Sequence, residues 1–237
     1  MKRHEVRIKE TIATIIADGR FISVAEAEIL RQRSFIENYI LEYPCFRTAL
    51  EPYPVRPDVP EIIFRMADAA ARVGVGPMAA VAGAVAEFAL KAMIEAGATH
   101  AIVDNGGDIA MVLSQPVVVG IFTGPAKIKD IGLKFQPRPG IIGVCTSSGT
   151  VGHSLSFGQA DAATVISSDV CLADAAATAL GNAMKKNDSA LIEEGMKNVQ
   201  IEGIEGMLVI VDDTMAYCGN LPEIVKIKMD MEKISKG

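Results

Sequence analysis

Residues 99–113 read THAIVDNGGDIAMVL and decide the class of fold. The runs 99–103 and 109–113 are short and apolar and have turn-forming residues between them, which predicts two strands. Asn105-Gly106 is the strongest short signal for a tight hairpin turn. The stretch therefore predicts two neighbouring strands joined by a turn.

Strands and helices are mixed on both sides of this hairpin, without a regular strand–helix–strand repeat. Helices are expected at about 24–41, 62–73, 77–96, 168–185 and 189–197. Further strands are expected at 5–16 (two short strands), 117–122, 141–145 and 165–167. The tail is expected to form an antiparallel meander from 199–203, 207–211, 214–218 and 224–229. This mixture predicts an α+β fold, with a mixed sheet packed with helices in a single unit spanning 1–237.

Two local signals mark boundaries within that unit. Ser23-Val24-Ala25-Glu26 has the form of a capping box, which predicts that the first helix begins there. Prolines are frequent from Pro44 to Pro60 and break regular structure. We expect 43–59 to be an ordered, proline-stiffened connection that does not separate independent domains.

The composition excludes several classes of protein. Hydrophobic residues make up 50% of the chain and charged residues 22%, which is typical of an ordered globular protein. A net charge of −6 argues against nucleic acid as a partner. The first residues, MKRHEVRIKE, lack the apolar core of a signal peptide. The most apolar stretch, 73–86, is shorter than the ~20 residues of a membrane span. We expect a cytoplasmic protein without a membrane partner and leave open whether it forms a homo-oligomer.

Four short stretches combine glycine or other small residues with oxygen donors, and each lies where a strand ends or a helix begins. Glycine lets the backbone approach a ligand closely, and hydroxyl and carboxylate oxygens suit phosphate or a hard cation. Together they predict a phosphorylated ligand bound with magnesium. The stretches are Asn105, Gly106, Gly107 and Asp108; Thr146, Ser147, Ser148 and Gly149; Gly152, His153 and Ser154; and Asp174 with Thr178.

Asp174 and Thr178 are four residues apart and share one face of a helix. Their alanine neighbours leave space around them, and a carboxylate with a hydroxyl is the type of ligand that magnesium prefers. The alternative is an aspartate that only favours the helix dipole in the first turns.

The other stretches also have simpler alternatives. The turn 105–108 is also explained as a hairpin turn alone. The stretch 146–149 is also explained as a serine-rich surface turn, although such a loop can hold phosphate through its backbone amides. His153 is the best histidine for chemistry, because His4 is near the terminus and His100 precedes a strand.

Residues 74–87, GVGPMAAVAGAVAE, formally match the glycine pattern of a dinucleotide-binding motif. That motif must follow a strand, whereas this stretch follows a helix, so we reject the match. The backbone amides at the start of the 77–96 helix can still hold an anion. The other interpretation is a tight corner between helices, in which alanines allow close packing.

The order NGGD, TSSG, Gly-His and AD-x-x-x-T resembles the ApbE-like proteins, whose characterised members are flavin transferases that move FMN from FAD onto a protein threonine. The stretch 74–87 resembles a UPF-type branch of that superfamily, known mostly from archaea and anaerobic bacteria. The resemblance implies an ApbE-like fold. It also implies a FAD- or FMN-type nucleotide lined by 105–108, phosphate at 146–149, and Mg²⁺ at Asp174 and Thr178.

The chain departs from the transferases in one element. Where they have H-x-x-D-P-x-T-G, this chain has His153 followed by Ser154-Leu155-Ser156-Phe157-Gly158. Ser156 and Phe157 thus replace an Asp-Pro pair, and Asp161 is a substitute carboxylate displaced in sequence. The departure predicts ligand binding without efficient flavin transfer.

Cys145 supports an alternative function. It ends an apolar strand and opens the 146–149 loop, so backbone amides and His153 are expected to lower its pKa. The resulting thiolate would serve as a persulfide carrier in sulfide assimilation. His153 and Cys145 are therefore the candidate catalytic residues. A third alternative is a non-catalytic accessory protein that keeps only the fold.

Overall fold

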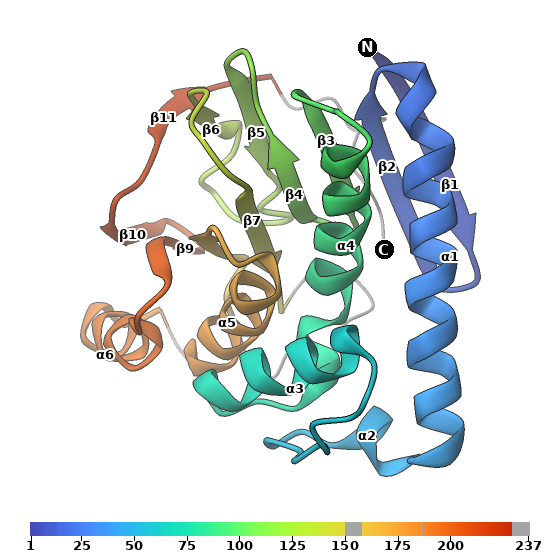
Figure 1. The fold of residues 1–237 in the computed structure, drawn as a ribbon. Helices are drawn as coiled ribbons and strands as arrows, with labels where there is room; N and C mark the ends of the chain where they lie inside the picture. The colour runs from blue at the N-terminus through green and yellow to red at the C-terminus, as the bar shows by residue number, and fades with distance from the viewer. Residues whose placement is uncertain (150–157, 186, 229–237) are drawn as a thin grey trace.

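The computed structural model describes residues 1–149, 158–185 and 187–228. Helices and antiparallel strands are mixed along the chain, which confirms the predicted α+β class (Figure 1). The helices are α1 (Gly19–Glu42), α2 (Cys45–Thr48), α3 (Glu61–Val73), the 3-10 helix η1 (Pro77–Ala80), α4 (Val81–Glu95), α5 (Val170–Ala183) and α6 (Ser189–Val199). The strands are β1 (Lys2–Ile8), β2 (Thr11–Ala17), β3 (Ala101–Asn105), β4 (Asp108–Val112), β5 (Val117–Ile121), β6 (Ile131–Phe135), β7 (Ile142–Ser147), β8 (Ala162–Ser167), β9 (Ile204–Val211), β10 (Thr214–Gly219) and β11 (Glu223–Lys226).

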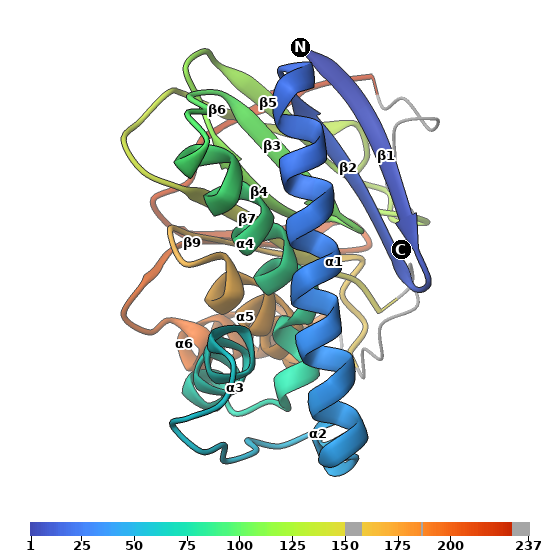
Figure 2. The ribbon, with the colours of Figure 1, turned by 45° about the vertical axis from the view of Figure 1, so that its right-hand side comes forward.

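The strands form a large and a small sheet. The large sheet has the order β1-β2-β3-β4-β7-β8-β9-β10, with every neighbouring pair antiparallel, and the small sheet has the order β11-β6-β5. Helices α1, α4 and α5 cover one face of the large sheet (Figures 1 and 2). The small sheet packs against the opposite face through a second apolar core.

Strand β9 shows how one strand serves both cores. Met207 and Val209 are buried in the core beneath the helices, whereas Leu208 and Ile210 are buried in the core shared with the small sheet. Successive side chains of a strand point to opposite faces, and a strand covered on both faces is apolar throughout.

The helix that runs through η1 and α4, from Pro77 to Glu95, is apolar because it lies inside the fold. It is the one helix of the described residues long and apolar enough to cross a membrane, and 61% of its most apolar window is buried. It packs against α1, α5 and β3. Burial within the protein therefore accounts for its composition.

The start of the first helix differs from the sequence prediction. Helix α1 begins at Gly19, and Asp18 is its N-cap, with a side chain that accepts a hydrogen bond from the Arg20 amide at 3.1 Å. The capping box at Ser23 is therefore wrong. Phe21 is buried and adds to the packed face of α1, so tertiary contacts extend the helix toward its N-terminus.

The C-terminal meander is also corrected. The expected strand at 199–203 is absent, because α6 runs to Val199 and turn residues follow. β9 and β10 form a hairpin, but β11 leaves it and pairs with β6, a strand that the sequence reading missed. Pro222 has no amide to donate to a ladder, and the chain changes sheets at this point.

Candidate functional site

The first turns of α4 and α5 lie against each other. In each of them, backbone amides donate hydrogen bonds to a carboxylate from the other helix. The Gly83 amide of α4 donates to Asp174 Oδ2 at 2.8 Å. The amides of Val170 and Cys171 in α5 donate to Glu87 Oε2 at 2.9 and 3.1 Å. Amides in the first turn have no acceptor within their own helix, and the helix dipole favours an anion there. Each helix therefore caps the other.

Gly83 permits this close approach. A Cβ atom at this position would lie 2.7 Å from the Asp174 Cβ and 2.7 Å from the Val170 carbonyl oxygen. The anion predicted for the start of the 77–96 helix is present here, at the Gly83 amide. The anion is a carboxylate of the protein itself.

Asp174 is buried, with 7% of its surface exposed. Burial raises its pKa to about 7, although hydrogen bonds from the Gly83 and Ala82 amides act in the opposite direction. None of the ion pairs formed among the described residues includes Asp174. Within the described part of the chain, the partners of its carboxylate are therefore the backbone amides of Gly83 and Ala82.

Asp108 brings a second carboxyl group to the same place. It begins β4, directly after the turn glycines Gly106 (φ 71°) and Gly107 (φ 104°), and lies opposite Cys145 in the β4–β7 register. Asp108 is half-buried, and its carboxyl group accepts a hydrogen bond from the Thr146 backbone amide. Burial raises the Asp108 pKa well above its usual value, and the Asp174 charge raises it further. The NGGD turn and helix α5 thus meet at a pair of acids.

The β3–β4 turn is tied to α4 by Asn105. This side chain is buried, and its Nδ2 donates to the Ala82 carbonyl oxygen at 3.1 Å. The Gly107 amide donates to Asp104 Oδ1 at 3.0 Å, which holds the turn closed. Asn105 therefore positions the turn against the first turn of α4.

The residues of this region that could hold a metal ion are oxygen donors. Thr178 follows Asp174 by one turn of α5, on the same face of the helix, and is partly exposed. Within 1–149, 158–185 and 187–228, no group of three or more His, Cys, Asp and Glu side chains is arranged to hold a metal ion. Mg²⁺ is usually held by one or two carboxylates, with water and substrate phosphate completing its shell. Two carboxyls and a hydroxyl match that donor set.

Successive side chains of the stretch 146–149 point to opposite faces of the large sheet. The Thr146 hydroxyl lies 2.9 Å from the Thr164 hydroxyl, on the face toward the small sheet. It is therefore separated from the acids, and only the Thr146 backbone amide reaches Asp108. Ser147 is buried on the helix-facing side, and Ser148 is half-buried.

Gly149 marks the base of the loop that follows β7. Its amide donates to the Ala160 carbonyl oxygen at 2.9 Å. A Cβ atom on Gly149 would lie 2.1 Å from the Gly158 carbonyl oxygen. Gly149 therefore closes the loop base. Gly152, His153, Ser154, Ser156 and Phe157, which carry the predicted histidine element, lie outside the described residues.

The expected thiolate at Cys145 is wrong. Cys145 is fully buried, and its Sγ lies 3.6 Å from the Val170 carbonyl oxygen. Burial raises the Cys145 pKa well above its usual value, and the charges of Asp108 and Asp174 raise it further. Both effects favour the neutral thiol over the thiolate. The sequence showed the loop beside Cys145 but not the acids that face it.

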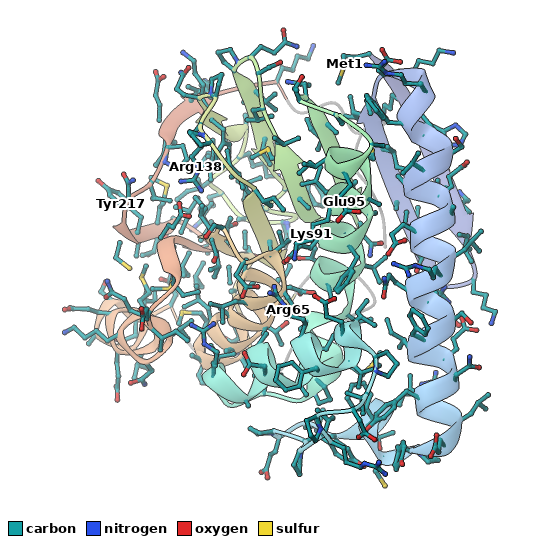
Figure 3. The ribbon with its side chains drawn as sticks, in the orientation of Figure 1. Met1, Arg65, Lys91, Glu95, Arg138 and Tyr217 are labelled. Carbon is teal, nitrogen blue, oxygen red and sulfur yellow. The ribbon has the colours of Figure 1, made fainter. Side chains whose placement is uncertain are left out.

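Glu87 was missed by the sequence reading. It ends the long apolar stretch that begins at Val73, and a single acid within such a helix is the signal that could have found it. Its Oε1 lies 2.9 Å from Arg65 Nη2 and 2.7 Å from Lys91 Nζ. Figure 3 shows Arg65 and Lys91 close together on this face. Arg65 also contacts the α5 N-cap, Asp169, at 2.8 Å.

Sequence comparison connects the chain with one family. A family model described as "AbpE bacteria" matches residues 1–211. The UPF0280 protein of Methanocella arvoryzae is 50% identical over all of this chain and 96% of its own length. Those of Methanosarcina acetivorans and Archaeoglobus fulgidus are 48% and 44% identical over all of this chain, covering 93% and 100% of their own lengths.

Solved structures with a similar fold include two ApbE proteins. An ApbE protein of Thermotoga maritima aligns over 100% of both chains with a TM-score of 0.56 and 13% identity. The apo form of a flavinyl transferase ApbE from Pseudomonas stutzeri aligns over 92% of this chain and 93% of its own, with a TM-score of 0.53 and 13% identity. At this identity the likeness concerns the fold.

Proposed function

The chain belongs to the ApbE-like UPF0280 family, and on that premise we propose that it binds Mg²⁺ together with a flavin or related nucleotide diphosphate. The observation that carries the proposal is the pair of neighbouring acids formed by half-buried Asp108 and buried Asp174. Both have a raised pKa, and neither takes part in an ion pair among the described residues. A divalent cation would relieve their mutual repulsion and the cost of their burial.

Asp174 and Asp108 would hold the metal through carboxylate oxygens, and Thr178 would add a hydroxyl. When bound, Mg²⁺ would supply positive charge to neutralise a diphosphate. The chain itself orients the donors, because Gly83 fixes one oxygen of Asp174 and Asn105 fixes the β3–β4 turn against α4.

The nucleotide assignment rests on the glycine turn and on the family. Gly106 and Gly107 have positive φ, so the backbone of the turn approaches its surroundings without side chains in the way. The similar Pseudomonas stutzeri structure is named a flavinyl transferase. We therefore favour FAD or FMN over other phosphorylated ligands.

Efficient flavin transfer is not part of the proposal. Ser156 and Phe157 stand where the transferases have an Asp-Pro pair. Incubation with FAD, Mg²⁺ and a threonine-containing acceptor, followed by in-gel fluorescence, is expected to show little covalent flavin. Strong labelling of the acceptor would show that the departure in sequence does not prevent transfer.

Calorimetric titration with Mg²⁺ in the presence of FAD or ADP tests the binding site. The Asp174→Ala variant is expected to lose most of its Mg²⁺ affinity, while Asp213→Ala, which removes an exposed acid in the β9–β10 turn, should bind as the wild type does. Fluorescence titration with FAD reports nucleotide binding separately. Equal Mg²⁺ affinity in the wild type and Asp174→Ala would refute the metal site. The absence of both ligands would favour a non-catalytic accessory protein.

A further inference from the structure

The large sheet ends in two edges of different character. β1 carries charged side chains at Lys2, Arg3, Glu5 and Arg7. β10 reads TMAYCG and carries none. Charged side chains are one way in which natural edge strands avoid pairing with another chain. Across the part of the chain that the structure describes, no strand pairs with the outer edge of β10, so this edge lacks the protection of β1.

The outer face of β10 continues an apolar surface that is buried on β9. Met215 lies opposite Ile210, and Tyr217 lies opposite Leu208. Opposite residues of paired strands project to the same face. Ile210 and Leu208 are fully buried, whereas Met215 is 38% and Tyr217 61% exposed. The small sheet therefore covers β9 and leaves β10 uncovered.

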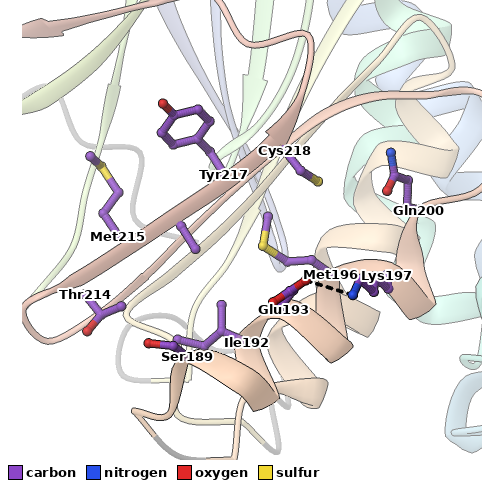
Figure 4. A pocket seen from close by; sticks show the side chains of 11 residues that line it. Ser189, Ile192, Glu193, Met196, Lys197, Gln200, Thr214, Met215, Tyr217 and Cys218 are labelled. Carbon is purple, nitrogen blue, oxygen red and sulfur yellow. Dashed lines mark ion pairs between the residues drawn. The ribbon is translucent and has the colours of Figure 1, made fainter.

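A groove runs between this edge strand and helix α6 (Figure 4). It has a volume of about 470 Å³, with Met196 on the helix side and Cys218 on the strand side. Glu193 and Lys197 also line it and form an ion pair of 2.8 Å, one helical turn apart, with both side chains well exposed. The groove thus joins an unpaired backbone edge, apolar side chains and one charge of each sign.

We propose that the β10 edge pairs with β10 of a second copy of this chain, antiparallel and about a two-fold axis, so that two large sheets become one continuous sheet. An unpaired edge presents amides and carbonyls that an extended strand satisfies. A two-fold axis perpendicular to the sheet makes a strand antiparallel to its own copy. The acids that precede β10 do not oppose this, because Asp212 and Asp213 are both paired with Lys127.

The side chains and charges of this region are self-complementary about the centre of β10. With the axis at Ala216, Met215 lies opposite the partner's Tyr217 on the outer face, and a methionine sulfur packs favourably against an aromatic ring. The same axis runs the two α6 helices antiparallel, so the order of Glu193 and Lys197 in one copy is reversed in the other and like charges are not aligned along the groove. A second copy is therefore complementary to the apolar strip and compatible with the charges of α6.

The proposed interface is separate from the acids of the functional site. β10 is three strands away from β7 in the sheet order, and Asp108 and Asp174 lie on β4 and α5. Changes on the edge are therefore expected to alter assembly without altering Mg²⁺ or nucleotide binding.

Light scattering coupled to size exclusion, on the full chain over a concentration series, tests the proposal. The wild type is expected at twice the chain mass of 25.1 kDa. Tyr217→Lys places a charge on the edge and is expected to give a monomer. The matched control is Val118→Lys, which charges an exposed apolar residue on an edge strand of the small sheet, and it should remain dimeric. A wild-type monomer at every concentration, or a dimer that survives Tyr217→Lys, would overturn the proposal.

A cross-linking variant tests the register independently of any loss of folding. With the axis at Ala216, residue 214 lies opposite the partner's Cys218. Thr214→Cys is therefore expected to form a disulfide-linked dimer with oxidised glutathione, and the further change Cys218→Ser should abolish it. Within one strand these positions are too far apart to bridge. Failure of Thr214→Cys to cross-link, with Val118→Cys as the control for random collision, would exclude this register and contradict the proposal.

Discussion

Glu87 and Asp174 each cap the first turn of the other's helix, but only Glu87 is met by cationic side chains. Arg65 and Lys91 lie 2.9 and 2.7 Å from Glu87 Oε1, and two backbone amides bind its other oxygen. Each carboxylate also comes from a matching position, four residues after the amide of its own helix that the other carboxylate caps. The Glu87 end of the helix pair is therefore a complete structural ion-pair network.

The Asp174 end lacks those cations and has a second acid instead. Burial raises the pKa of both groups, and the Asp174 charge raises the pKa of Asp108 further. A fold that needed only caps for two helices would not place Asp108 there, since like charges held together are unfavourable. The difference indicates that the Glu87 end of the pair serves stability, and it motivates our proposal that the Asp174 end takes a cation from solution.

The largest expected effect is the loss of unfolding free energy when Glu87 is removed. Glu87→Ala leaves two amides uncapped and Arg65 without one of its acids, and breaking a buried ion pair costs about 3–5 kcal/mol of unfolding free energy. Urea denaturation measures it. Asp58→Ala, which removes an exposed acid paired with Arg56, is the control and should lose far less. Equal losses in the two variants would remove the distinction between the two ends of the helix pair.

The next largest expected effect is the rise in unfolding free energy on adding Mg²⁺, which should depend on Asp174 and not on Glu87. Mg²⁺ at 100 times its dissociation constant stabilises a folded protein by about 2.7 kcal/mol. The wild type is expected to show such a rise in unfolding free energy, Asp174→Asn is expected to show almost none, and Glu87→Gln should keep it. Thermal denaturation with and without Mg²⁺ measures the three. If Glu87→Gln lost the effect and Asp174→Asn kept it, the roles assigned to the two ends would be reversed.

The dependence of stability on pH is expected to be smaller. The pKa of Asp174 is about 7 in the folded protein and about 3.9 in an unfolded chain. Between these values the folded state binds more protons, so the unfolding free energy of the metal-free protein falls as pH rises, by at most about 1.4 kcal/mol per pH unit for this group. Asp174→Asn removes the contribution. Urea titrations at pH 5 and 7 in a chelator compare the slopes, and identical slopes would contradict the raised pKa.

The smallest expected effect is the difference in alkylation rate between two buried thiols, one from each end of the helix pair. Cys145 lies beside the acid pair and Cys171 beside Glu87, and burial raises the pKa of both. Limited alkylation of the native protein, read by peptide mass spectrometry, should label exposed Cys45 first and leave both buried thiols unmodified. Faster labelling of Cys145 than of Cys171 would show that the acid pair opens to solvent. Labelling of Cys145 ahead of Cys45 would restore the thiolate hypothesis.

Much of the fold could be predicted because local signals were strong. The helix expected at 62–73 ends at Val73, where Gly74 is a left-handed C-cap, and the 105–108 turn joins two antiparallel strands. The prediction failed where local signals were ambiguous or where packing decided. Ser23 resembled a cap but lies inside α1, and β6, sequence IGLKF, has only a short apolar pattern.

The sequence by itself determined the α+β class, the family resemblance and the residue types of the site, because turn glycines, apolar periodicity and short motifs are local properties. Only the tertiary structure decided which residues meet. It brought Asp108 to Asp174, turned the Thr146 hydroxyl to the opposite face, and placed Arg65 and Lys91 beside Glu87, whereas no ion pair among the described residues includes Asp174. The physical reason is that the charge state and reactivity of a side chain depend on burial and on neighbours far away in the sequence. Cys145 shows this most clearly, since its sequence neighbours favour a thiolate and its spatial neighbours favour the thiol.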